Sequence, residues 1–243
     1  AYVLFVLLTR GLWRKPSIPD LDREPGFQDM YLTAPMLSIT SIGAGTGSTT
    51  SYLLPRLRAL PAGRVEYTFT DVSPLFLQRA AAKFPDAPFL RTKLLDIGAD
   101  LAAQGFAPES FDLVVGANVL HATPDLAVTV GHVRRLLAPG GRLVLLEGAT
   151  PQRFGDLTVG LLDGWWCYTD SQRRDYALMP RAPWLRLFGE CGFERATALP
   201  EEGQGAVLDQ QAVYVADAPA AAAAPSRWVV VPDGTGVARA LAS

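Results

Sequence analysis

Between residues 37 and 217, apolar runs of strand length alternate with amphipathic runs of helix length. This alternation is typical of βα units arranged around a parallel sheet. Strands are expected at 38–42, 66–71, 89–93, 111–117, 142–147, 194–199 and 211–216, and helices at 51–60, 75–84, 126–137 and 183–191. The last two strands could pair antiparallel at one edge. The pattern therefore predicts an α/β fold with a mainly parallel sheet of about seven strands and helices on both faces.

The two ends of the chain differ from this core in composition and in the pattern of apolar residues. Several prolines interrupt residues 1–36, which predicts an irregular or helical N-terminal cap or lid. The apolar start, 1–8, is too short to span a bilayer and is expected to be a buried helix or strand. Residues 218–225 form an Ala/Pro run of linker composition, and 227–231 restart a strand. We therefore expect a cap over 1–36, a core domain over 37–217, and a linker with the start of another domain over 218–243.

Charge and cysteine content exclude several classes of function. The chain has 22 Lys+Arg and 24 Asp+Glu, a formal net charge of -2, so it has no bulk positive field for a nucleic-acid backbone. Neither nucleic acid nor membrane is expected as a partner. Cys167 and Cys191 lie far apart and form no CxxC motif, which argues against a disulfide scaffold or a zinc site. A reducing, cytoplasmic location is expected.

A glycine-rich segment joins the first predicted strand to the first helix. Its sequence is Ile42-Gly43-Ala44-Gly45-Thr46-Gly47. Glycines let the backbone turn sharply and approach a ligand where a Cβ atom would clash. We predict that Gly43, Ala44, Gly45 and Gly47 bind a nucleotide-like cofactor, although an ordinary βα turn is an alternative for so short a motif.

Polar side chains follow the next strands. Asp71 ends the second strand, beside Val72, where its carboxylate could accept hydrogen bonds from both ribose hydroxyls of a cofactor. The alternative is a helix N-cap. After the third strand, Asp96 and Ile97 could bind an adenine amino group and pack on its ring, or form a plain surface turn. Asn118, at the end of the fourth strand, could orient substrate or cofactor, or satisfy a turn.

Three motifs carry a family resemblance: 42–47, Phe111-Asp112-Leu113-Val114-Val115 and 136–141 resemble those of class I S-adenosylmethionine-dependent methyltransferases. Segments 69–74, 117–123, 145–148 and 164–166 are similar to the methyltransferase domains embedded in modular type I polyketide synthases. The tail 227–236 is similar to the start of the structural half of a polyketide ketoreductase. The resemblance implies a Rossmann-like fold, S-adenosylmethionine as cofactor, and two partners, an acyl carrier protein with a phosphopantetheine-tethered chain and an adjacent ketoreductase domain.

Two residues form a candidate catalytic pair. His121 follows the fourth strand and Glu147 ends the fifth, and neighbouring strand ends can bring them together. A carboxylate that holds one ring nitrogen leaves the other free to act as a general base, and the resemblance places both residues in the same dyad. His132, inside a predicted helix, is expected to be solvated or packed. No metal-ligand spacing is present, so no metal is expected.

The sequence gives less direct evidence for the methyl acceptor than for the catalytic pair. Trp165, Trp166 and Tyr168 could line an acyl pocket or be ordinary core aromatics. A histidine base serves either the α-carbon of a β-ketoacyl thioester or a β-hydroxyl. The carbon-methylating branch of the resembled family has a large N-terminal lid, and only residues 1–37 precede this glycine loop. We therefore expect O-methylation of a β-hydroxyl, with C-methylation as the alternative and an inactive structural domain as the alternative of another class.

Overall fold

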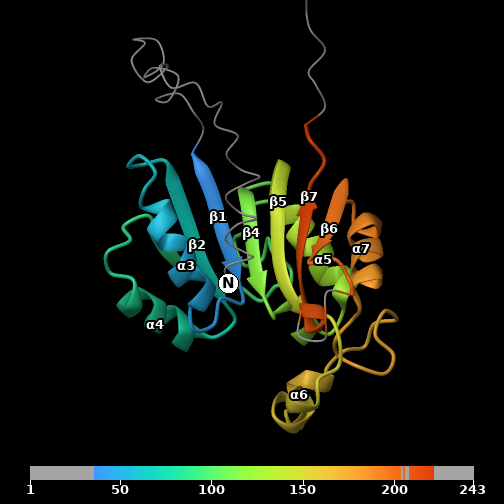
Figure 1. The fold of residues 1–243 in the computed structure, drawn as a ribbon. Helices are drawn as coiled ribbons and strands as arrows, with labels where there is room; N and C mark the ends of the chain where they lie inside the picture. Colours follow the sequence, from blue (N-terminus) through green and yellow to red (C-terminus); the bar gives the residue numbers. More distant parts are fainter. Residues whose placement is uncertain (1–35, 204, 206–207, 222–243) are drawn as a thin grey trace, which may run out of the picture.

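The computed structural model describes residues 36–203, 205 and 208–221, and they form one sheet with the strand order β3-β2-β1-β4-β5-β7-β6 (Figure 1). The strands are β1 (Leu37–Ile42), β2 (Val65–Asp71), β3 (Leu90–Leu94), β4 (Phe111–Ala117), β5 (Leu137–Gly148), β6 (Arg195–Leu199) and β7 (Gln211–Asp217). Strands β1 to β5 pair in parallel, whereas β7 is antiparallel to both β5 and β6. The predicted fold class is confirmed, including the antiparallel edge.

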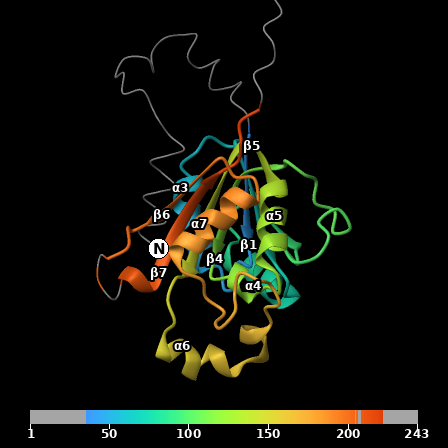
Figure 2. The ribbon, with the colours of Figure 1, turned by 90° about the vertical axis from the view of Figure 1, so that its right-hand side faces the viewer.

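Helices cover both faces of the sheet (Figures 1 and 2). The longer ones are α3 (Ser48–Leu57), α4 (Pro74–Lys83), α5 (Leu126–Leu136) and α7 (Arg181–Glu190), and the short ones are η2 (Leu120–Ala122), α6 (Arg153–Leu157), η3 (Val159–Leu161), η4 (Asp163–Trp166) and η5 (Leu208–Gln210). Leu113 and Val115 pack with α3 and α4, and the intervening Val114 packs with α5 and α7. This alternation along β4 buries both faces, as expected for a central strand.

Two element boundaries differ from the predictions. Helix α3 begins at Ser48, not 51, because Gly47 adopts a positive φ of 74° that ends the loop and lets the helix start at once. Strand β5 begins at Leu137, not 142, because Leu137 already pairs with Phe111 before the register shifts along β4. Both differences arise from backbone pairing and turn geometry, which the hydrophobic pattern does not encode.

The predictions for the two ends of the chain lie mostly outside the described residues. Residues 1–35 of the expected cap (1–36) and residues 222–243 of the expected linker and tail (218–243) are outside the described part, so both stay predictions. The sheet itself runs from Leu37 to Asp217. Among the described helices, none combines the length and hydrophobicity needed to cross a bilayer.

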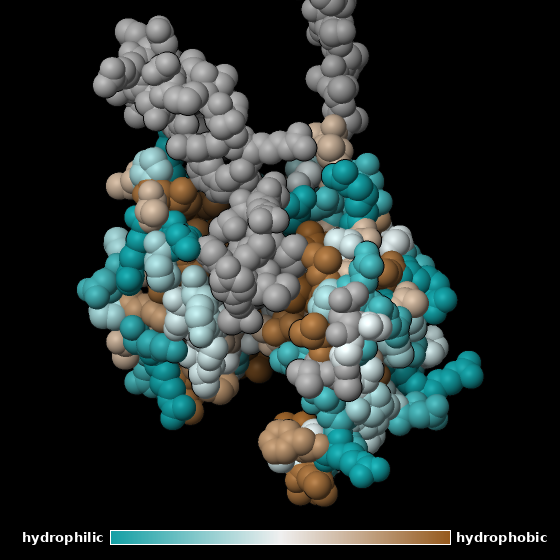
Figure 3. All heavy atoms as spheres, in the orientation of Figure 1, coloured by the Kyte–Doolittle hydropathy of each residue, from teal (hydrophilic) through white to brown (hydrophobic). Residues whose placement is uncertain are grey.

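One edge of the sheet collects the predicted site residues. The carboxyl ends of β1, β2, β4 and β5 lie at the lower edge in Figure 1, and the segment between β5 and α7 extends below it with α6. Phe154, Leu157 and Leu161 on this segment are 74–77% exposed, and apolar side chains gather there in Figure 3. Ligands of open parallel sheets bind at this edge.

Candidate functional site

The glycine loop is a sterically fixed turn. Gly43, Gly45 and Gly47 have φ angles of 52°, 53° and 74°, in the left-handed region that favours glycine. A Cβ atom on Gly43 would lie 2.2 Å from Val119 Cγ2, so no other residue fits without displacing the loop after β4. The Ala44 N–H donates to the carbonyl of Thr70 at 2.9 Å and ties the loop to β2.

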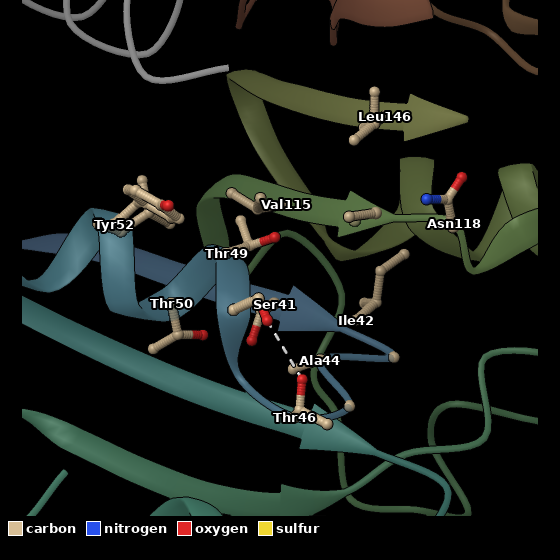
Figure 4. Close-up of a pocket in the computed structure, with 16 residues that line it drawn as sticks. Ser41, Ile42, Ala44, Thr46, Thr49, Thr50, Tyr52, Val115, Asn118 and Leu146 are labelled. Carbon is tan, nitrogen blue, oxygen red and sulfur yellow. Dashed lines mark hydrogen bonds between the residues drawn. The ribbon is translucent and has the colours of Figure 1, made fainter. Parts of the chain in front are cut away.

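A pocket of about 460 Å³ lies between the glycine loop, the start of α3 and the ends of β4 and β5 (Figure 4). Its size falls within the range of roughly 300–1,000 Å³ usual for small-molecule sites. Of the predicted cofactor residues, Gly43, Ala44, Gly45 and Asn118 line it. The structure therefore brings the loop after β1 and the loop after β4 to one cavity.

Asp71 lies beside the glycine loop. It is 5% exposed, and its two carboxylate oxygens accept from the N–H groups of Gly45 at 2.8 Å and Ser73 at 2.9 Å. The N-cap of α4 is Ser73, so the helix-cap alternative for Asp71 is wrong. Each oxygen keeps a second lone pair that a ribose hydroxyl could use. The neighbouring Val72 is 62% exposed.

Asp96 and Ile97 occupy a turn that other residues hold in place. Asp96 is exposed, its Oδ1 accepts from the Gly98 N–H, and Gln104 bonds to its backbone N–H and carbonyl. Ile97 is 5% exposed, and its carbonyl lies 2.7 Å from Nδ1 of His132. His132 is therefore a packed helix residue, and the Asp96–Ile97 turn remains a predicted contact for adenine.

His121 and Glu147 form a buried pair at the ends of β4 and β5. Nδ1 of His121 lies 2.6 Å from Oε2 of Glu147, and Oε1 accepts from the N–H groups of Val119 at 3.0 Å and Leu120 at 2.8 Å. Glu147 is fully buried and His121 is 9% exposed. Because a carboxylate only accepts hydrogen bonds, the neutral imidazole carries its proton on Nδ1 and leaves Nε2 with a free lone pair.

Asn118 makes the turn from β4 into η2. Its φ of 51° is a left-handed conformation that asparagine tolerates better than most residues, and its N–H donates to the Leu146 carbonyl at 2.7 Å. Its side chain also borders the pocket (Figure 4). Asn118 therefore does form the turn after β4, as the alternative had it. A role of its side chain toward cofactor or substrate stays a prediction.

The three predicted pocket aromatics occupy different environments. Trp165 packs edge-on against His121, with ring centroids 5.2 Å apart, and its buried Nε1 has no hydrogen-bond partner among the described residues. Trp166 is 46% exposed and donates to the Gly160 carbonyl, whereas Tyr168 lies 5.1 Å from the guanidinium of Arg173. Of the three, Trp165 is the one in ring contact with the dyad.

Two buried charged residues, Asp170 and Arg173, were not predicted from the sequence. Their side chains are 1% and 0% exposed and form an ion pair, and Arg173 donates to the carbonyls of His121 and Thr123. Burial raises the pKa of Asp170, but the hydrogen bonds from Arg173 and from the Leu126 N–H outweigh it and hold this pKa below its usual value. Opposite charges three residues apart in an irregular segment also occur on solvated loops, so the pattern gave no signal.

Across the part of the chain that the structure describes, no group of three or more His, Cys, Asp and Glu side chains is arranged to hold a metal ion.

Comparisons with known proteins agree on the kind of domain. Residues 41–143 match the family described as a methyltransferase domain. The "Highly reducing polyketide synthase lcsB" of Purpureocillium lilacinum is 37% identical over 173 residues, which cover 70% of this chain and 7% of that protein.

Two solved structures share the architecture. The CurJ carbon methyltransferase superposes with a TM-score of 0.73 at 44% identity, covering 82% of this chain and 51% of that one. The trans-methyltransferase CalH in complex with SAH superposes with a TM-score of 0.68 at 38% sequence identity, and the match covers 78% of this chain and 53% of that one. The chain thus spans about half the length of these two structures.

Proposed function

The chain carries a class I methyltransferase domain of the kind found in polyketide synthases, and from this premise we propose that it transfers the methyl group of S-adenosylmethionine to an acyl chain tethered to an acyl carrier protein. The observation that carries the proposal is the buried His121–Glu147 pair at the same sheet edge as a pocket that the glycine loop, Asn118 and Leu146 line. A ketoreductase domain in the same polypeptide belongs to the same proposal.

The residues around the pocket fit the cofactor. Gly43 and Gly45 line the pocket, and the position of a Cβ on Gly45 is nearly open. Asp71, which bonds to the Gly45 N–H, offers lone pairs for ribose hydroxyls. The CalH structure, 38% identical, contains SAH, the product form of the same cofactor. When bound, S-adenosylmethionine supplies an electrophilic methyl group on a positively charged sulfur.

The dyad supplies the base. Nε2 of His121 accepts the proton of the acceptor group, and the electron pair left behind forms the new bond to the methyl group as the bond from that methyl to sulfur breaks. Glu147 stabilises the imidazolium through Nδ1, and the proton then passes to solvent. Trp165 packs on the ring and keeps water from that side of it.

We propose that the acceptor is the α-carbon of a β-ketoacyl thioester. The supporting observation is the 44% identity to a carbon methyltransferase. The expectation of a β-hydroxyl acceptor rested on the short stretch before the glycine loop, and residues 1–35 lie outside the described part of the chain. The β-hydroxyl therefore becomes the alternative acceptor.

In the test, the protein and S-adenosylmethionine are incubated with each of two carrier proteins in separate reactions. One carrier protein is loaded with a β-ketoacyl chain and the other with a β-hydroxyacyl chain. Mass spectrometry of the ejected pantetheine arm should show a gain of one methyl group on the ketoacyl chain, and NMR should place it on the α-carbon. Methylation of the hydroxyacyl chain instead would overturn the carbon assignment. No methylation of either chain, with calorimetry showing no cofactor binding, would favour an inactive structural domain.

A further inference from the structure

The guanidinium of Arg173 lies under the loop that joins β4 to α5. It donates to the carbonyls of His121 and Thr123 at 2.6 Å each and to that of Pro124 at 3.2 Å. Asp170 fixes it from the other side, through Nε at 3.0 Å and a second bond to the Nη2 atom. One buried side chain thus donates hydrogen bonds to three carbonyls of the loop that contains the proposed base.

The segment around Arg173 anchors this loop. Backbone carbonyls that are buried without a donor are costly, and residues 118–125 lie between a strand and a helix. The segment supplies donors and acceptors, since the Thr169 N–H donates to Pro124 and Asp170 accepts from the Leu126 N–H. Trp165 from the same connection packs on the imidazole. The position of His121 is therefore set from residues more than 40 positions away.

We propose that Arg173 is a positioning residue for His121, and that the Asp170–Arg173 pair holds the imidazole where it can reach the acceptor. This inference rests on the proposed function. Glu147 orients the ring through Nδ1, whereas Arg173 fixes the main chain from which the ring projects. A displacement of about 1 Å at a reacting group can lower a rate about 100-fold.

The chain offers a matched control in Arg181. It is also buried, with 5% exposure, and it also donates to three carbonyls, those of Leu208, Asp209 and Gln211. These bonds hold η5 and the first residue of β7 and do not involve the loop of His121. Arg173→Lys and Arg181→Lys therefore make the same chemical change in two comparable clamps, and of the two only Arg173 bonds to the main chain of His121.

The kinetic arm compares these variants. We expect Arg173→Lys to lower kcat about 10-fold or more, with KM for the acyl carrier protein and the Kd of S-adenosylmethionine within about twofold of wild type. Arg181→Lys should keep kcat within about twofold, although both variants melt at a lower temperature. Equal kcat values in the two variants would show that Arg173 stabilises the fold without positioning His121, and would overturn the inference.

A spectroscopic arm does not depend on turnover, so it separates failure of this inference from failure of the proposed function. The chain has two histidines, and nitrogen-15 labelling of histidine gives spectra in which His132 serves as the internal reference. Arg173→Lys should shift or broaden the ring signals of His121, and Arg181→Lys should leave them unchanged. Unchanged His121 signals in a folded Arg173→Lys protein would contradict the inference.

If circular dichroism shows that Arg173→Lys does not fold, Asp170→Asn replaces it. This variant keeps the guanidinium but removes its charged partner, so kcat should fall below that of wild type and the His121 signals should still broaden. Wild-type kcat with wild-type His121 signals in Asp170→Asn would also overturn the inference.

Discussion

The cofactor side and the acceptor side of this site are held together in different ways. On the cofactor side, a side chain holds backbone groups of a neighbouring loop, as where the Asp71 carboxylate accepts from the Gly45 N–H. On the acceptor side, two side chains bond to each other, those of His121 and Glu147. The Arg173 side chain, 52 residues from His121, donates to the main-chain carbonyl of His121. Substitutions on the first side should act through backbone shape and affinity, and those on the second through rate.

The largest expected effect is on the acceptor side. His121→Ala removes the nitrogen that accepts the proton, so the rate of methyl transfer should fall about 100- to 10,000-fold, the usual contribution of a general base. Affinity for S-adenosylmethionine should stay within about twofold, because the glycine loop is untouched. Single-turnover mass spectrometry and calorimetry measure the two quantities, and normal turnover would remove His121 from the mechanism.

The next effect tests the backbone shape of the cofactor side. Gly43→Ala places a Cβ atom 2.2 Å from Val119 Cγ2 at a φ of 52°, so cofactor affinity should fall at least about 10-fold. Gly63→Ala is the control, since Gly63 also has a positive φ, 76°, but no atom of the described residues lies within 4 Å of the Cβ that alanine would add. It should lose about 1 kcal/mol of stability and keep its affinity. Equal affinities in the two variants would mean that the glycine loop does not shape the site.

A smaller effect is expected at Asp71. Asp71→Ala should weaken binding of S-adenosylmethionine by about 1–3 kcal/mol, the cost of leaving buried polar partners unpaired. Wild type should discriminate against the 2′-deoxy analogue of S-adenosylhomocysteine, and the variant should not. Asp100→Ala is the control, because exposed Asp100 accepts one backbone N–H, from Ala103, and takes no part in the predicted site. Discrimination that survives in Asp71→Ala would refute the ribose contact.

The smallest effect concerns Tyr176, which donates to Asp156 and packs on Trp165 and Trp166. Burial and the Asp156 charge raise the pKa of Tyr176 from 10.0 to about 12. A raised pKa in the folded state gives stability that is complete below pH 10 and is lost as pH rises through 12. Tyr176→Phe should therefore lower the melting temperature slightly at about pH 7 to 9, with a smaller difference at about pH 11. A difference that grows above pH 10 would contradict this assignment.

The two sides also differ in how far the sequence predicts them. The glycine loop directly follows the first predicted strand, and Asp71 is the last residue of the second. The motif and the strand pattern therefore place them at the same edge of the sheet. His121 and Glu147 could be paired because parallel neighbours end at one edge. Asp170 and Arg173 could not, since they lie in irregular chain whose path is set by tertiary contacts. The early starts of α3 and β5 escaped prediction because turn conformation and strand register, not hydrophobicity, determine them.

The central claim is that His121 and Glu147 act as one base. It is tested most directly by comparing the rates of methyl transfer of His121→Ala, Glu147→Gln and the double variant with that of wild type. If the carboxylate works only through the imidazole, Glu147→Gln should be slower than wild type and faster than His121→Ala, and the double variant should be no slower than His121→Ala. Rate losses that multiply in the double variant would show two independent contributions and would contradict the account.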